Sequence, residues 1–163
     1  MKTILDFKQG HAGAWTTVND DVMGGRSTSR LTPTEEGTAV FSGFVSLENN
    51  GGFASTRAPL GTLDLSEYEG VTLRVRGDGR RYQLRLRTEE GSGGLAYKGE
   101  FDTAAGEWQD VHLLFRDFQP SFRGRRPPGA PPLDPGEIRQ AGFLIADDRE
   151  GPFQLEVAWI RAE

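Results

Sequence analysis

The chain has 163 residues, of which 36% are hydrophobic and 10% aromatic, and this is enough for one domain with a substantial core. Its 19 basic and 24 acidic residues leave a net charge of −5, which argues against sequence-independent nucleic-acid binding. Cysteine is absent and there are two histidines, so disulfides, thiolate zinc sites and cysteine nucleophiles are excluded. We therefore expect no metal centre and no cofactor.

No segment indicates targeting or membrane insertion. Asp6 and Lys8 interrupt the apolar run that a signal peptide needs, and no apolar stretch approaches the length that spans a bilayer. We expect a cytoplasmic protein that does not insert into membranes.

The N-terminal part of the chain alternates short apolar segments with loops. Residues 4–7 are predicted as an opening strand, and residues 15–18 follow it, with Trp15 as a core anchor. In residues 38–48, Ala39, Phe41, Val45 and Leu47 alternate with a more polar set of positions, and this period of two is typical of a strand. Gly43 in this run allows a bend or bulge.

Two related loop motifs stand out in this region. Asn19–Ser29 reads NDDVMGGRSTS and Glu48–Ser55 reads ENNGGFAS. Each places acid or amide side chains before a Gly-Gly pair, a composition that hydrogen-bonds its own backbone and reaches Gly-only conformations. Turn chemistry alone explains such a composition, but loops held by a rigid sheet also often carry function. The candidate rim residues are Asn19, Asp20, Asp21, Met23, Arg26, Glu48, Asn49 and Asn50.

The clearest local pattern predicts an antiparallel hairpin. Val71–Arg76 and Tyr82–Arg87 both alternate strictly, and the Gly-rich segment 77–81 between them supplies turn chemistry. If the apolar side of each strand faces the core, four arginines share the opposite face: Arg74, Arg76, Arg85 and Arg87. Like charges on one patch repel one another, so either solvent and local acids screen them or a polar or anionic partner binds there.

The C-terminal half continues with short strands. Residues 95–101 and 108–115 are predicted strands, with His112 on the surface face of the second. The closing strands are predicted at 141–146 and 153–160. Eight or more short strands with almost no helical periodicity predict an all-β fold: a β-sandwich of jelly-roll type that forms one domain over the whole chain. An immunoglobulin-like topology is the alternative.

A segment rich in Pro, Gly and Arg interrupts these strands at 119–135. We predict a long extended loop rather than a domain linker, because strands resume after it. At its end, Asp134 is suited to cap a single helical turn that Pro135 begins.

Several segments carry a family resemblance: Trp15, 18–27, 41–43, 47–55, 73–79, Trp108 and 118–124. Together they resemble the complex I intermediate-associated protein family, and the resemblance runs nearly end to end. It implies a galactose-binding-like jelly roll and, in mitochondrial members, a non-enzymatic role in assembling respiratory complex I. The chain begins directly at the domain, without a transit peptide, and so is similar to the stand-alone bacterial members. The resemblance implies no catalytic residues.

Two kinds of binding module fit these observations. A protein-binding module or assembly chaperone would use the rim loops and the Pro/Arg-rich loop, where Phe122, Arg123 and Arg125 combine an apolar anchor with guanidinium groups. Its partner would be a protein such as a respiratory complex subunit. A module for a carbohydrate or small polar ligand would use the four arginines and Tyr97 on an open sheet face. We favour the protein-binding module.

An enzyme is the third class, and we do not expect one. The paired carboxylates on offer are Asp20-Asp21 and Asp147-Asp148, and adjacent residues converge on one substrate only where they lie in a loop. Calcium binding by the same loop oxygens is a lesser alternative, since the loops match no known calcium motif.

Overall fold

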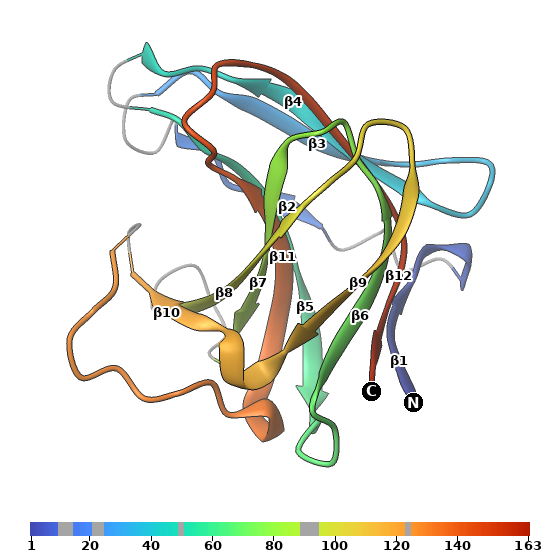
Figure 1. Ribbon diagram of the computed structural model, residues 1–163, viewed down its shortest axis with the longest axis vertical. Helices are drawn as coiled ribbons and strands as arrows, with labels where there is room; N and C mark the ends of the chain where they lie inside the picture. The colour runs from blue at the N-terminus through green and yellow to red at the C-terminus, as the bar shows by residue number, and fades with distance from the viewer. Residues whose placement is uncertain (10–14, 21–24, 49–50, 89–94, 123–124) are drawn as a thin grey trace.

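The computed structural model describes residues 1–163 except 10–14, 21–24, 49–50, 89–94 and 123–124. The described residues form two six-stranded antiparallel sheets (Figure 1). Sheet A contains β1 (Lys2–Asp6), β3 (Thr28–Pro33), β4 (Ala39–Val45), β6 (Gly70–Arg76), β9 (Trp108–Leu114) and β12 (Gly151–Ala162). Sheet B contains β2 (Thr16–Thr17), β5 (Ala54–Leu63), β7 (Arg81–Arg87), β8 (Ala96–Asp102), β10 (Gln119–Ser121) and β11 (Ile138–Ile145).

The order of strands confirms the predicted β-sandwich of jelly-roll type. Sheet A runs β3-β4-β12-β6-β9 with β1 beside β12, and sheet B runs β10-β8-β7-β11-β5-β2. The chain passes repeatedly from one sheet to the other, as between β5 and β6 and between β8 and β9. The helical elements of the described residues are the short 3-10 turns η1 (Phe7–Gln9), η4 (Phe115–Asp117) and η5 (Pro135–Glu137). None of the described helices is long and apolar enough to cross a membrane.

The core lies between the two sheets and follows the period of two along each strand. Phe41 and Leu73 of sheet A and Leu84 of sheet B are fully buried. Trp15 closes one end of this core, since its ring lies 5.9 Å from the ring of Phe7 and 6.1 Å from that of Phe143. The predicted role of Trp15 as a core anchor is confirmed.

The predicted hairpin of residues 71–87 is wrong. Both segments are strands, but β6 pairs with β12 and β9 whereas β7 pairs with β8 and β11. Arg80, in the link between them, is buried and makes a bidentate ion pair with Asp147 at 2.6 and 2.9 Å. Its guanidinium also donates to the carbonyl oxygens of Gly151 and Pro152. The link is therefore held against the turn that precedes β12, and the chain changes sheet instead of reversing within one.

This change of sheet also corrects the predicted arginine patch. Arg74 and Arg76 lie on the outer face of sheet A, whereas Arg85 and Arg87 lie on the outer face of sheet B. The four side chains therefore form two separate pairs on opposite faces of the sandwich.

Three strands were not predicted: β3, β5 and β10, the last of which occupies the start of the loop predicted at 119–135. Strand β3 is an edge strand whose side chains are mostly exposed, so it lacks apolar alternation. Strand β5 turns small residues such as Ala54 and Ala58 toward the core and contains Pro59, which is uncommon inside a sheet. The turn predicted at the end of the Pro/Arg-rich loop is confirmed as η5, where Asp134 accepts a hydrogen bond of 2.9 Å from the N–H of Gly136.

Candidate functional site

The carboxylate of Asp20 ties the two loop motifs together. The side chain is fully buried and accepts hydrogen bonds from the N–H and hydroxyl of Ser27 (2.8 and 2.5 Å) and from the N–H groups of Gly52 and Phe53 (2.7 and 3.3 Å). Burial raises the pKa of the Asp20 carboxyl, but these hydrogen bonds outweigh burial and hold the pKa below its ordinary value. Because the chain itself supplies these donors, Asp20 is a structural clamp inside the fold.

The glycines of both motifs allow this clamp to close. A Cβ at Gly25 would lie 2.4 Å from Cγ of Asp20, and one at Gly51 would lie 2.6 Å from its Oδ2. The neighbouring Asn19 acts in the same way, since its Oδ1 accepts from the hydroxyl of Ser29 at 2.6 Å and from the N–H of Ser55 at 3.1 Å. The motifs thus join the starts of β3 and β5.

Other rim candidates are more open or are not described. Arg26 and Glu48 form an ion pair of 3.5 Å in which both side chains are about two-thirds exposed, at 69% and 66%. Such a pair is weak and is available to a partner. The remaining predicted rim residues lie outside the described residues: Asp21, Met23, Asn49 and Asn50.

The arginines of sheet A are paired within the fold. Arg76 donates to Oε1 of Glu156 at 2.6 and 3.2 Å, and its guanidinium lies 5.0 Å from the ring centroid of Trp108. Arg74 makes an ion pair of 3.0 Å with Asp110 and lies 5.5 Å from the same ring. These contacts use the charge of both side chains, so Arg74 and Arg76 offer little free positive charge.

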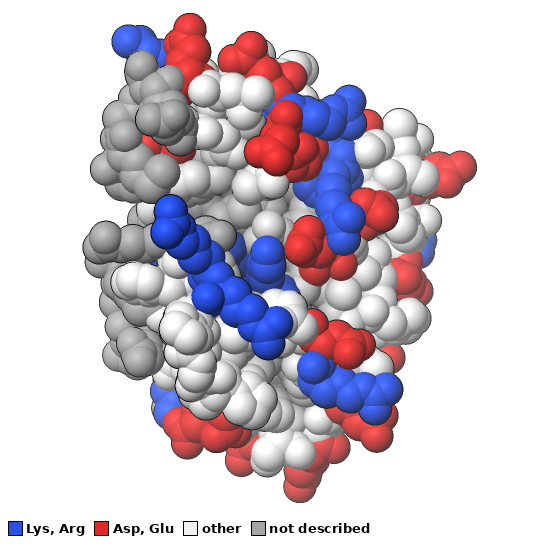
Figure 2. Space-filling model, turned by 60° about the vertical axis from the view of Figure 1, so that its left-hand side comes forward, with Lys and Arg blue, Asp and Glu red and all other residues white. Residues whose placement is uncertain are grey.

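The outer face of sheet B carries a different arrangement, which we call the cationic face: Arg57, Arg85, Arg87 and Lys98. Arg57 of β5 and Arg85 of β7 stand opposite the same residue of β11, Gly142, and Lys98 of β8 faces Arg85 from the other side. Arg87 follows two residues along β7. Figure 2, which brings the left-hand side of Figure 1 forward, shows basic side chains gathered in and around a hollow near the centre, with acidic side chains above, to the right of and below it.

Gly142 lets strand β5 approach β11 closely. A Cβ at this position would lie 2.4 Å from the carbonyl oxygen of Thr56 and 2.9 Å from Cβ of Arg57, so only glycine fits. Strand β11 therefore has no side chain between Arg57 and Arg85.

The charges of this face are only partly neutralised. Lys98 lies 3.5 Å from Glu100, which also pairs with Arg81. Among the described residues, no carboxylate forms an ion pair with Arg57 or Arg85. Arg85 donates to Oε1 of Gln83 at 2.9 Å, while its buried Nε has no partner among the described residues.

Burial lowers the pKa of all three arginines of this face, and repulsion from a neighbouring arginine adds to it at Arg85 and Arg87. Burial, followed by the charge of Arg87, lowers the pKa of Arg85 to about 10. Burial and the charge of Arg57 lower the pKa of Arg87, and burial alone lowers that of Arg57. All three remain cations at neutral pH, so the face retains charge that the described part of the fold does not balance.

Tyr97 was predicted on an open sheet face, but it lies on the core side of β8. It is 3% exposed, pairs with Leu86 across the strands, and donates from its hydroxyl to the carbonyl oxygen of Pro131 at 2.9 Å. It therefore anchors the Pro/Arg-rich loop to the sandwich, and it is not a platform for a ligand.

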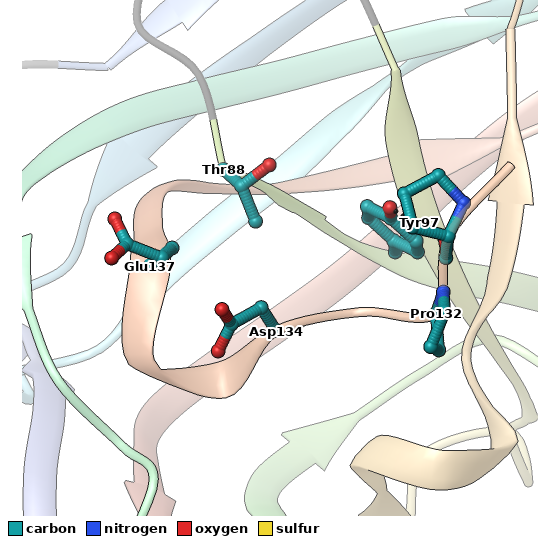
Figure 3. A pocket seen from close by; sticks show the side chains of 6 residues that line it. Thr88, Tyr97, Pro132, Asp134 and Glu137 are labelled. Atoms are coloured by element: carbon teal, nitrogen blue, oxygen red, sulfur yellow. Dashed lines mark hydrogen bonds between the residues drawn. The ribbon is translucent and has the colours of Figure 1, made fainter.

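A shallow hollow of about 360 Å³ lies beside this anchor (Figure 3). Thr88, Tyr97, Asp134 and Glu137 border it together with the prolines of the loop. Its carboxylates already have local partners, because Asp134 caps η5 and Glu137 pairs with Arg139 at 2.9 Å. We assign no function to this hollow.

The Pro/Arg-rich loop presents the predicted apolar anchor. Phe122 is 43% exposed, and its N–H and carbonyl exchange hydrogen bonds of 2.7 and 3.0 Å with the backbone of Arg125, which is also exposed. This backbone pairing places an exposed aromatic residue opposite an exposed arginine, and both residue types are enriched at protein interfaces. Arg123 lies outside the described residues.

Two of the four carboxylates considered for catalysis, Asp20 and Asp147, have structural partners. Asp147 is held by Arg80. Burial raises the pKa of Asp147, but the hydrogen bonds from Arg80 outweigh burial and hold the pKa below its ordinary value. His112 lies on the surface of β9 and shares a 2.8 Å hydrogen bond with Thr72. Within the described ranges, no three His, Asp or Glu side chains gather as ligands for a metal ion.

Sequence reasoning missed Arg57, Lys98 and Gly142. Strand β5 and the pairing partners of β7 were not predicted, and only the pairing of these strands brings the three residues together. The alternation of Ala54, Thr56 and Ala58 with polar residues and proline is the signal that indicates strand β5.

Comparison with known proteins adds a family and a fold. The family model "Complex I intermediate-associated protein 30 (CIA30)" matches residues 5–157. The mitochondrial complex I intermediate-associated protein 30 of Mus musculus is 28% identical over 90% of this chain and 51% of its own length, and that of Drosophila melanogaster is 30% identical over 98% and 62%. The chain thus spans about half to two-thirds of the length of these relatives.

A solved structure shows the same fold. It is a family 11 carbohydrate-binding module from Clostridium thermocellum in complex with a β-1,3-1,4-mixed-linked tetrasaccharide. The TM-score is 0.68 at 18% identity, and the match covers 96% of this chain and 94% of the module. At this identity the similarity concerns the architecture of the sandwich.

Proposed function

Because the chain belongs to the complex I intermediate-associated protein 30 family, we propose that it is a non-enzymatic, protein-binding assembly factor whose partners are subunits of a respiratory complex. The observation that carries this proposal is the family match over residues 5–157, which includes both loop motifs. The names of the mitochondrial relatives supply the kind of partner.

The chemistry of the described residues supports a binding role over a catalytic one. Asp20 and Asp147 accept hydrogen bonds that lower their pKa values, which is the reverse of what a general acid at neutral pH requires. Groups suited to an interface are present instead: the exposed ring of Phe122 and the partly exposed cations of the cationic face.

Affinity capture with the full chain as bait tests the proposal. We expect repeated enrichment of respiratory complex subunits from native lysate, identified by mass spectrometry, over an unrelated β-sandwich bait of similar net charge. Recovery of the same proteins by both baits, or of no respiratory subunit, would reject the assembly function.

Binding of a carbohydrate or small polar ligand is the second candidate function. It is favoured by the fold shared with a carbohydrate-binding module and by the guanidinium groups on sheet B. The outward positions of the described sheet B strands carry no aromatic ring to stack on a sugar, since Tyr97 and Phe101 face the core. Calorimetric titration with the mixed-linked tetrasaccharide distinguishes the two functions, and we expect no heat of binding.

A further inference from the structure

We propose that the cationic face of sheet B is a docking site for an acidic, extended polypeptide segment of a partner protein. This inference rests on the proposed protein-binding function and specifies the surface and the chemistry of the partner. It is carried by the strand register, in which Gly142 places no side chain between Arg57 on one side and Arg85 on the other.

The charge of this face is the first argument for an acidic partner. The whole chain has a net charge of −5, yet three arginines and a lysine gather on one side of sheet B. Neither Arg57 nor Arg85 has a carboxylate partner among the described residues, and the Nε of Arg85 is buried without a hydrogen bond there. A carboxylate bound between Arg57 and Arg85 would accept charge-assisted hydrogen bonds from the accessible guanidinium nitrogens of both side chains.

The spacing of the arginines is the second argument. Adjacent strands are about 4.8 Å apart, so Arg57 and Arg85, which lie on either side of β11, start roughly 10 Å apart. Three residues of a polyproline II segment cover about the same length, roughly 9 Å, and complete one turn, so every third side chain points to the same side. Carboxylates at every third residue of such a segment would therefore meet successive cations across the sheet.

The surroundings favour a peptide over a neutral sugar. No aromatic ring lies at the outward positions of the described strands of this sheet, so a sugar ring has no apolar platform.

Fluorescence anisotropy with the purified full chain tests this site directly. The probe is a short fluorescein-labelled peptide with glutamate at every third residue, and its control carries glutamine at those positions. We expect binding of the glutamate peptide alone, weakening as salt rises above about 0.1 M, where the Debye length is ~10 Å. Equal binding of the glutamine peptide would overturn the proposal.

Matched variants locate the binding on the molecule. Arg57→Gln/Arg85→Gln should weaken peptide binding by about tenfold or more, because each guanidinium group would form charge-assisted hydrogen bonds with a carboxylate. Arg30→Gln/Arg116→Gln removes the same charge from two exposed arginines outside this face and should weaken it less than about twofold, by loss of screened long-range attraction alone. Equal losses in both double variants would show a general charge effect and overturn the docking site.

Further measurements keep the result interpretable. Melting curves should be unchanged in the Arg57→Gln/Arg85→Gln variant, and if it fails to fold, Arg57→Lys/Arg85→Lys replaces it and should weaken binding by losing the guanidinium fork. Displacement of the peptide by the neutral mixed-linked tetrasaccharide would assign the face to sugar and overturn the proposal. Peptide binding without respiratory subunits in the capture rejects the assembly function alone, and the reverse result rejects this docking site alone.

Discussion

Replacement of Asp20 by asparagine should destabilise the fold more than the same replacement at an exposed aspartate. The substitution keeps the shape of the side chain but places an NH₂ group where the carboxylate accepts from Ser27, Gly52 and Phe53. At least one of these donors loses its partner in a fully buried site, at about 1–3 kcal/mol for each unsatisfied group, and the charge assistance of the others is lost as well. We expect a loss of roughly 2–4 kcal/mol in the free energy of unfolding.

Thermal denaturation is the assay, with Asp117→Asn as the control at an exposed site. For a chain of this length, 1 kcal/mol shifts the melting temperature by about 2–4 °C, so Asp20→Asn should lower it by roughly 4–16 °C. The control should melt within about 1 °C of the parent, because surface substitutions rarely exceed ±0.5 kcal/mol.

The stability difference between the parent and Asp20→Asn should also depend on pH in a defined direction. The hydrogen bonds hold the folded pKa of Asp20 below its ordinary value, so their contribution is fully present above the unfolded pKa of about 3.9 and is lost as the pH falls through the folded pKa. The difference between the parent and Asp20→Asn should thus be constant near neutrality and shrink below about pH 4. Equal stability at neutral pH, or a difference that grows on acidification, would refute the clamp.

Three further predictions concern the fold. Arg76→Gln should lower the free energy of unfolding, measured in urea, by about 1–3 kcal/mol, because Glu156 is 8% exposed and loses its ion pair. Arg85→Gln should leave the free energy of unfolding unchanged or raise it. The opposite ranking of the two variants would contradict the assignment of the two faces. Arg80→Met should cost about 3–5 kcal/mol by leaving the carboxylate of Asp147 unpaired in a buried site, as measured by chemical denaturation, and an unchanged midpoint would show that the link does not depend on this pair. Gly25→Ala should lower the melting temperature, since its Cβ would lie 2.4 Å from Cγ of Asp20, while full stability in this variant would mean that the motif loop can shift.

The fold class and most strands could be predicted because they depend on short-range alternation. The burial of Val71, Leu73 and Val75 follows directly from the period of two, and so does that of Leu84 and Leu86. Strand pairing could not be predicted in the same way, because it depends on contacts between distant residues. Arg80 bonds to Asp147, 67 positions later, and this contact helps to hold β6 and β7 in different sheets.

The site was harder to predict than the fold for a related reason. The composition of the loop motifs indicates hydrogen bonding but does not show whether a carboxylate serves the chain or a ligand. Asp20 is saturated by donors from Ser27 and from the second motif, and the sequence gives no measure of that saturation. Arg85 was correctly identified as a cation on a sheet face, but its neighbour Arg57 belongs to a strand with weak apolar alternation.

The central claim is that Arg57 and Arg85 serve a partner and not the fold. The most direct test is affinity capture with three baits compared side by side: the parent chain, Arg57→Gln/Arg85→Gln and Arg30→Gln/Arg116→Gln. We predict that all three baits melt at the same temperature and that only Arg57→Gln/Arg85→Gln loses the captured respiratory subunits. Retention of the same partners by that bait at parental levels would contradict the claim.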